Sequence, residues 1–190
     1  DCDKQANATE RLWPKSQELE YPTLFEILTH KVKIQDAIIN VSDSLDLLPS
    51  DLQNQLLDER ITEKNINLGG FFKKALSELG YEVIIFDTEP DLSKINFMAM
   101  ATCDTVLVPM RQDRDSLKGL RMVRDFLEDQ KEEWPEIKAE IRPIINFLDG
   151  RMTTRALNKV SEIQEDGFRL MNTLIRVDNE FSDAQTKGSI

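Results

Sequence analysis

Two groups of acidic residues in this sequence could hold a magnesium ion beside a nucleotide. Asp87 ends the apolar run of residues 83–86, and Asp1 and Asp3 stand two positions apart at the beginning of the sequence. Magnesium prefers hard oxygen ligands and keeps part of its water shell, so a carboxylate at a strand end can hold the ion directly or through water. Taken alone, Asp87 is also explained as a cap of the following turn, and the other two acids as a surface turn.

The sequence offers few residues for a histidine-based or cysteine-based catalytic or metal site. His30 is the single histidine, which argues against a histidine-based triad or zinc site and suggests a surface helix residue. The two cysteines, Cys2 and Cys103, lack the spacing of a metal site, and their small number suits a reducing cytosol. No apolar run approaches the roughly 20 residues of a membrane helix. The sequence therefore predicts a cytoplasmic protein without a membrane partner.

The composition is that of a globular protein with an acidic excess. Of the 190 residues, 40% are hydrophobic and 31% are charged, and the net charge is −11. This length suffices for one domain with a sizeable core. From Arg151 onward six basic residues balance six acidic ones, so the acidic excess lies before that position. The acidity disfavours strong nucleic-acid binding; the neutral C-terminal part could hold a modest basic face, although a mixed-charge solvated surface also explains it.

Apolar runs alternate with helical patterns along the whole chain. This alternation predicts an α/β fold with a largely parallel, doubly wound sheet. Within it we expect Ser116 to cap a helix, and Pro143 to mark an edge or a strand start. The expected helices are residues 24–39, a helix capped by Asp51 in which Leu52, Leu56 and Leu57 share a face, and residues 71–79, 95–101, 117–127, 156–163 and 180–185. The expected strands are residues 44–49, 83–86, 105–109, 141–147 and 170–175.

Function should be sought where the strands end. Ligands of doubly wound sheets sit outside the carboxyl ends of the strands. The polar residues that follow the expected strands are Asp87, residues 109–115 and residues 146–151. These three places are therefore the candidate site of the fold.

Five segments, in order along nearly the whole chain, match short sequence motifs. Residues 1–9 resemble D-x-D-P-Q-x-N-A-T, residues 45–50 resemble L-D-L-I-P-S, and residues 81–88 resemble Y-D-x-I-I-I-D-T. Residues 102–109 with 115–120 resemble A-A-D-x-V-L-I-P and S-x-x-G-L, and residues 146–151 resemble N-x-Y-D-x-R. With these motifs the chain resembles the ParA/MinD family of deviant Walker ATPases, and the ParA partition branch most closely; residues 81–88 resemble its Walker B segment.

The resemblance implies a role for each matching residue. Asp87 would be the Walker B acid that steadies the Mg²⁺ shell, and Asp1 would act on the metal from a second layer. Asp3 would position or polarise the attacking water, and Asn146 would recognise the adenine edge. Such roles suit phosphoryl transfer, which needs positioning and charge neutralisation more than covalent chemistry. The implied fold is of the P-loop NTPase type, and the implied cofactors are ATP and Mg²⁺.

The resemblance also implies partners and a cellular role. A ParA-type protein forms a homodimer with ATP, binds DNA without sequence preference, and hydrolyses ATP when a ParB-like partner stimulates it. For DNA contact, Arg151, Arg155 and Lys159 are the basic residues to test first. The expected role is plasmid or chromosome partition, or the positioning of another cargo, in a nucleoid-associated protein. A MinD-like membrane-positioning ATPase fits the pattern of residues 1–9 less well.

Three departures from the family pattern qualify this expectation. Lys4 and Glu89 replace prolines, and Glu89 adds negative charge near a site meant for a polyanionic nucleotide. The K-G-G-x-G-K-T phosphate loop, whose backbone N–H groups and lysines grip phosphate, does not occur in the 190 residues.

The missing loop determines how the chain is interpreted. We expect residues 1–190 to be a single truncated ParA-like ATPase domain, an internal fragment that lacks the first strand, the phosphate loop and the first helix. Because that first strand would pair with residues 83–86, the bare chain should fold poorly or associate, and it should not bind Mg-ATP tightly. The alternative is a degenerate interaction module of the same fold that works without a nucleotide.

Overall fold

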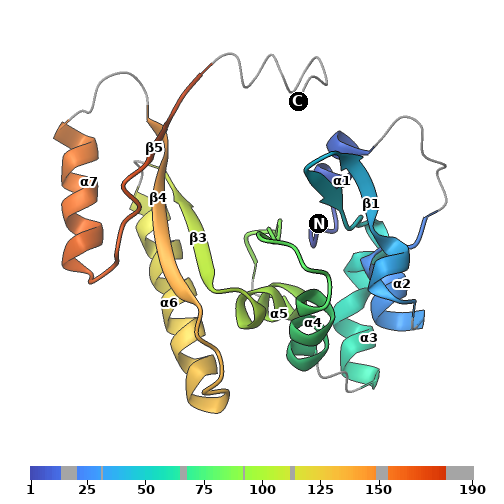
Figure 1. Ribbon diagram of the computed structural model, residues 1–190. Coiled ribbons are helices and arrows are strands. Elements are labelled where there is room, and N and C mark those ends of the chain that lie inside the picture. The colour runs from blue at the N-terminus through green and yellow to red at the C-terminus, as the bar shows by residue number, and fades with distance from the viewer. Residues whose placement is uncertain are drawn as a thin grey trace. The chain divides into compact units, whose positions relative to one another are not determined.

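The protein divides into two compact units, Asp1–Thr102 and Cys103–Ile190. The computed structural model describes residues 1–13, 21–30, 32–64, 68–91, 93–111, 114–148 and 154–178 (Figure 1). Among these residues, no helix is both long enough and apolar enough to cross a membrane.

The first unit is mostly helical and carries one small antiparallel hairpin. Strands β1 and β2 pair with Ile39 opposite Leu47 and Asn40 opposite Asp46. Short helices precede and follow this hairpin along the chain (Figure 1). The elements are α1 (Asn7–Leu12), α2 (Leu24–His30), the 3-10 helix η1 (Ile34–Ala37), β1 (Ile39–Ser42), β2 (Leu45–Leu47), the 3-10 helix η2 (Leu52–Leu56), α3 (Leu57–Lys64), α4 (Leu68–Ser77) and α5 (Lys94–Thr102).

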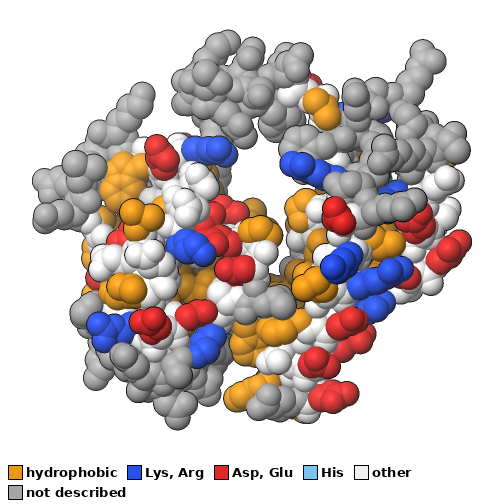
Figure 2. All heavy atoms as spheres, turned by 180° about the vertical axis from the view of Figure 1, so that it is seen from behind, with side chains coloured by type: hydrophobic (Ala, Val, Ile, Leu, Met, Phe, Trp, Pro, Cys, Tyr) orange, Lys and Arg blue, Asp and Glu red, His pale blue; other side chains and the backbone are white. Residues whose placement is uncertain are grey.

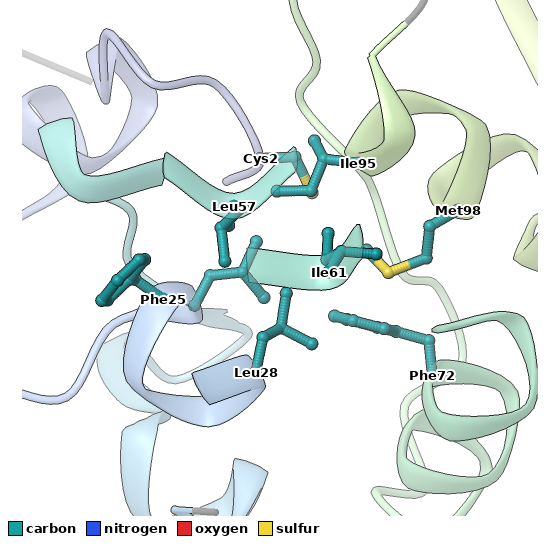
Figure 3. Close-up of a cluster of buried hydrophobic side chains, with 9 residues drawn as sticks. Cys2, Phe25, Leu28, Leu57, Ile61, Phe72, Ile95 and Met98 are labelled. Atoms are coloured by element: carbon teal, nitrogen blue, oxygen red, sulfur yellow. The ribbon is translucent and has the colours of Figure 1, made fainter. Parts of the chain in front are cut away.

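A hydrophobic cluster holds the first unit together. Leu57 and Ile61 are one helical turn apart on α3, and both are buried. Figure 3 shows the labelled side chains from α2, α3, α4 and α5 converging on this pair, with Cys2 at the edge of the group. Burial raises the pKa of the Cys2 thiol. The full cluster is Cys2, Leu24, Phe25, Leu28, Leu57, Ile61, Phe72, Ile95 and Met98.

The prediction of helix over residues 24–39 is only partly right. α2 ends at His30, η1 follows, and Ile39 is already the first residue of β1. The apolar residues in this stretch therefore serve two elements. Ile34 and Ala37 are buried in a separate small cluster with Ile27, whereas Ile39 is buried as part of the hairpin. Local periodicity could not show this because the hairpin depends on pairing with β2.

The predicted strand at residues 83–86 is not formed in this structure. The segment between α4 and α5 has neither helix nor strand, and its apolar side chains Val83 and Ile85 are 74% and 83% exposed. A strand requires a ladder of hydrogen bonds to a neighbour. Among the described residues, the segment's backbone contact with another element is the bond from the Cys2 N–H to the Asp87 carbonyl, 2.8 Å long.

The second unit is an α/β layer with a parallel sheet, which confirms the predicted class. The strand order is β3–β4–β5, and both pairings are parallel. A core of buried residues, among them Met110, Leu120, Ile145 and Ile163, joins the sheet to helices α6 and α7. The elements are β3 (Thr105–Met110), α6 (Arg114–Glu133), β4 (Glu140–Leu148), α7 (Thr154–Glu165) and β5 (Leu174–Arg176).

Two local expectations in this unit are wrong. α6 begins at Arg114, so Ser116 lies inside the helix, where its hydroxyl accepts a hydrogen bond from the Arg111 N–H. Pro143 lies in β4, the middle strand of the three, rather than at an edge. Proline removes only a donor, and the Pro143 carbonyl still accepts from the Met171 N–H at 2.9 Å.

Two further predictions concern the C-terminal part of the chain. β5 covers Leu174–Arg176, a shorter stretch than the predicted residues 170–175, and it ends one residue later. The helix expected at residues 180–185 lies outside the described residues.

Candidate functional site

The carboxylate of Asp1 organises the first turn of the chain. It accepts hydrogen bonds from the Asp3 N–H at 3.0 Å and from both the N–H and the hydroxyl of Thr9 at 2.8 Å. Ala6 makes this possible because its left-handed conformation, with φ of 51°, turns the chain back before α1. Asp1 is half-buried. Its side chain therefore shapes the loop that carries Asp3, which agrees with an indirect role beside a metal.

Asp3 sits on the loop that Asp1 shapes. Its Oδ1 accepts from the Gln5 N–H at 2.7 Å, and its carbonyl accepts from the Ala6 N–H and from the Ser50 hydroxyl. Within the described part of the chain, no hydrogen bond to its Oδ2 is found. The loop is thus fixed through its backbone while one carboxylate oxygen can still accept from a water molecule.

Ser50, three residues after the end of β2, ties this loop to the rest of the first unit. Its N–H donates to the Thr9 hydroxyl at 2.9 Å and its own hydroxyl donates to the Asp3 carbonyl at 2.7 Å. The main-chain nitrogen of Asp1 donates to the Leu48 carbonyl at 2.9 Å. Sequence reasoning assigned no role to Thr9 or Ser50, although both belong to segments that match the family pattern.

Asp87 lies beside this loop. The hydrogen bond from the Cys2 N–H to the Asp87 carbonyl places the residue between Asp1 and Asp3 against the end of the segment that Asp87 terminates. The Asp87 side chain is exposed. The structure therefore brings together the two segments that carry the three predicted acids. Among the described residues, however, no three His, Cys, Asp or Glu side chains form a ready metal cluster.

The residues present still fit magnesium. Mg²⁺ is usually held by one or two carboxylates together with substrate phosphates and several waters, so a cage built entirely of protein ligands is not needed. An exposed carboxylate such as Asp87, next to a loop with a second acid, is the donor set that this coordination requires.

Lys4 and Glu89, the two departures from the family pattern, contact each other. The Lys4 ammonium lies 2.7 Å from Oε2 of Glu89, and the Lys4 N–H donates to Oε1 of the same carboxylate at 3.1 Å. The hydrogen bond to Glu89 raises the pKa of Lys4, and Asp91 contributes at 4.0 Å. The negative charge that Glu89 adds near Asp87 is thus matched by a positive one on the neighbouring loop.

Asn146, the predicted adenine contact, lies in the second unit. It is half-buried near the end of β4, the middle strand of the parallel sheet. A residue at the carboxyl end of a parallel strand is at the position where such folds bind ligands. Its role toward the adenine stays a prediction.

Three basic residues, Arg151, Arg155 and Lys159, were predicted to contact DNA, and the structure describes only some of them. Arg151 lies outside the described residues, and Arg155 is in α7. The Lys159 side chain is 6% exposed and its ammonium donates to Glu162 at 2.8 Å. This burial argues against Lys159 as a phosphate contact. Figure 2 shows Lys and Arg side chains interspersed with Asp and Glu on the face that it draws.

The part of the chain that carries the acidic segments matches a known protein family. The family described as AAA domain matches residues 1–141, which is most of the chain and includes both acidic segments. The chain belongs to this ParA-like ATPase family. The resemblance found in the sequence motifs is thereby confirmed.

The chain is similar to a cell division protein and to a plasmid partition protein, and it spans only part of the length of each. The cell division protein PomZ of Myxococcus xanthus is 24% identical over 99% of the chain, which spans 59% of PomZ. Apo McdA of Cyanothece has a TM-score of 0.81 at 20% identity, covering all of the chain and 77% of McdA. The ATP complex of a singly substituted McdA has a TM-score of 0.78 at 18% identity, covering 99% of the chain and 74% of that protein. A plasmid partition protein of Borrelia burgdorferi gives 0.71 at 25% identity, covering 98% of the chain and 78% of that protein.

These structural likenesses confirm the P-loop NTPase fold that the motifs predicted.

Proposed function

We propose that this chain is part of a ParA-type ATPase that binds and hydrolyses Mg-ATP to segregate DNA or to position another cargo. The observation that carries the proposal is the hydrogen bond from the Cys2 N–H to the Asp87 carbonyl. It sets the loop with Asp3 against the segment that ends in Asp87. Family membership and the likeness to McdA, which is also known as an ATP complex, support the same function.

In this proposal each of the described site residues has a separate role. Asp87 would hold Mg²⁺ directly or through a water molecule, and Asp3 would accept a hydrogen bond from the attacking water through its Oδ2. Asp1 and Thr9 keep the Asp3 loop in shape. Bound magnesium supplies charge neutralisation on the phosphates. The Lys4–Glu89 pair keeps the added carboxylate from repelling the nucleotide.

The grip on the phosphates needs a part of the protein outside these 190 residues. No K-G-G-x-G-K-T loop occurs in them, and the backbone N–H groups of such a loop supply most of the phosphate binding. The whole protein's activity is therefore proposed for the full natural chain.

Asp3→Ala and Asp87→Ala test the two roles separately. In the full natural chain, Asp3→Ala should lower ATP turnover by about 100-fold or more, as loss of a residue that handles a proton does, while nucleotide affinity stays near that of the wild type. Asp87→Ala should weaken Mg²⁺-dependent binding of ATP. Asp43→Ala is the matched control because Asp43 is an exposed acid in the turn between β1 and β2, and it should change neither quantity.

Equal turnover in the wild type and in Asp3→Ala would remove the water-handling role. If the full natural chain shows no binding of Mg-ATP in a calorimetric titration, the alternative function follows, namely an interaction module that works without a nucleotide.

We further propose that the ATP-bound protein forms a homodimer, binds DNA without sequence preference, and is stimulated by a ParB-like protein. Arg155→Ala should then weaken DNA binding and flatten its dependence on salt, because each phosphate contact releases counterions. Arg169→Ala is the control, since this arginine side chain is 75% exposed in the same unit. An equal effect of both substitutions would show general charge attraction instead of a defined contact at α7.

A further inference from the structure

The buried hydroxyl of Ser50 contacts the backbone of Asp3 from a distant part of the sequence. Ser50 is 3% exposed, and its hydroxyl donates to the Asp3 carbonyl at 2.7 Å across 47 positions of the chain. The same carbonyl accepts from the Ala6 N–H at 3.0 Å, but Ala6 belongs to the loop of Asp3 itself. Among the described residues, the bond from Ser50 is therefore the one that fixes the Asp3 carbonyl against another segment of the unit.

Asn54 in η2 sets the direction of this hydroxyl. Its side-chain nitrogen lies 2.6 Å from the Ser50 hydroxyl oxygen, and the residue is 6% exposed. A hydroxyl has one proton to donate, and a backbone carbonyl can only accept. Because the Ser50 proton goes to the Asp3 carbonyl, the Asn54 amide faces the hydroxyl with its nitrogen and donates to it. The Ser50 hydroxyl is thereby held in one orientation.

This arrangement leaves the oxygen of the Asn54 amide without a partner. Its Oδ1 is buried and has no hydrogen bond among the described residues. A buried acceptor without a donor destabilises a fold, and each one in a native structure calls for an explanation. An apolar side chain at position 54 would avoid this penalty, but it would also remove the bond that orients Ser50. The buried amide is thus explained by the hydroxyl that it holds.

A second branch of hydrogen bonds runs from Ser50 to the other side of Asp3. The Ser50 N–H donates to the Thr9 hydroxyl at 2.9 Å, and that hydroxyl donates to Oδ2 of Asp1 at 2.8 Å. Oδ1 of Asp1 accepts from the Asp3 N–H at 3.0 Å. The two branches therefore end on the two backbone polar groups of Asp3. Since Oδ1 of Asp3 is held by the Gln5 N–H at 2.7 Å, its Oδ2 is left to accept from water.

We propose, on the basis of the ATPase function above, that Ser50 is a positioning residue for the hydrolysis step and that Asn54 orients it. Ser50 touches neither the nucleotide nor the attacking water. It fixes the backbone of Asp3, and with it the place where Oδ2 meets the water. A displacement of about 1 Å from the reacting geometry can cost about 100-fold in rate. Loss of the hydroxyl should therefore slow hydrolysis without weakening nucleotide binding.

Substitutions at position 50 of the full natural chain test this role through ATP turnover. Ser50→Ala keeps the N–H bond to Thr9 and removes the hydroxyl, so kcat should fall about tenfold while KM for ATP changes by less than about twofold. Ser50→Thr keeps a hydroxyl and should retain most of the turnover. A packing role predicts the reverse order, because the added methyl group crowds a buried position. Ser44→Ala is the matched control, since it removes an exposed hydroxyl in the turn between β1 and β2, and it should change neither quantity.

Double variants show whether each residue acts through the next one. Asn54→Ala should lower kcat about threefold and have no further effect in Ser50→Ala, because its influence passes through that hydroxyl. Ser50→Ala should likewise leave the residual single-turnover rate of Asp3→Ala unchanged. Thermal melts identify any variant that fails to fold. If Ser50→Ala is one of them, kcat of Asn54→Ala decides, and a value equal to that of the wild type overturns the proposal.

Three other results overturn the positioning role and leave the ATPase function in place. The first is equal kcat in the wild type and in Ser50→Ala. The second is a raised KM with unchanged kcat in Ser50→Ala, which would assign the hydroxyl to nucleotide binding. The third is a further loss of rate when Ser50→Ala is added to Asp3→Ala. Absence of ATP turnover in the wild type would instead overturn the ATPase function and this inference together, before any variant is compared.

Discussion

Residues 83–86 and strand β3 carry the same sequence pattern and end in different structures. Each is an apolar run that follows a helix. β3 pairs along its whole length with β4, from Thr105 opposite Glu140 to Met110 opposite Ile145. The run at residues 83–86 has no such ladder in the described structure, and Ile85 is 83% exposed. The difference teaches that an apolar run becomes a strand only when a neighbour satisfies its backbone.

The largest expected effect comes from comparing two single variants, Ile145→Ala and Ile85→Ala, by their free energy of unfolding. In the 190-residue chain, Ile145→Ala should destabilise the second unit by about 2–5 kcal/mol, because Ile145 is 1% exposed and its removal leaves a cavity. Ile85→Ala should change stability by less than about 0.5 kcal/mol. Urea unfolding followed by circular dichroism measures both. A comparable loss in Ile85→Ala would mean that another part of the protein covers Ile85.

The contact between Lys4 and Glu89 gives an intermediate effect. If this pair anchors the irregular segment to the Asp3 loop, Lys4→Ala and Glu89→Ala should each lower the melting temperature by a few degrees, and the double variant by less than the sum. The coupling should fade as salt is raised. The control is Arg142 with Glu140, a pair at 2.9 Å on the regular strand β4. Equal coupling in both pairs would show that the irregular segment gains nothing special from its ion pair.

The hydrogen bond from Tyr81 to Asp46 gives the smallest effect and a pH signature. It joins the start of the irregular segment to β2. The bond from Tyr81, followed by that from Asn40, lowers the pKa of Asp46. Burial, followed by the bond to Asp46, raises the pKa of Tyr81 to about 12.

The lowered pKa of Asp46 and the raised pKa of Tyr81 predict the pH range in which Tyr81→Phe lowers the free energy of unfolding. The lowered pKa of Asp46 stabilises the fold above the ordinary carboxyl pKa, and this stabilisation is lost as the pH falls through the lowered value. The raised pKa of Tyr81 stabilises it below the ordinary phenol pKa, and this is lost as the pH rises toward about 12. Because Tyr81 is 40% exposed and Asp46 is half-buried, solvent screens their contact, and Tyr81→Phe should cost at most about 0.5 kcal/mol near pH 7. Unfolding at pH 7 and pH 3 measures it, and a cost that does not change with pH would contradict the assignment.

The sequence predicted the acidic residues of the candidate site but not the residues that hold them in place. The family motifs pointed to Asp1, Asp3 and Asp87, and the structure brings their two segments together through Cys2. The same motifs could not show that Thr9 and Ser50 hold the Asp3 loop, because these bonds depend on the left-handed turn at Ala6 and on the position of the hairpin. Lys159 was expected at a surface, but its side chain is buried against Glu162, which charge counting cannot reveal.

The amino-acid sequence by itself determined the family, the α/β class and the positions of most helices, because periodicity and turn residues act locally. Gly80, with φ of 72° just after α4, shows such a local signal at work. Only the tertiary structure decided that Lys4 and Glu89 pair, that the Lys159 side chain is buried, and that Thr9 and Ser50 hold the Asp3 loop. Those features depend on contacts between residues far apart in the chain, and a linear pattern does not contain the distances that set them.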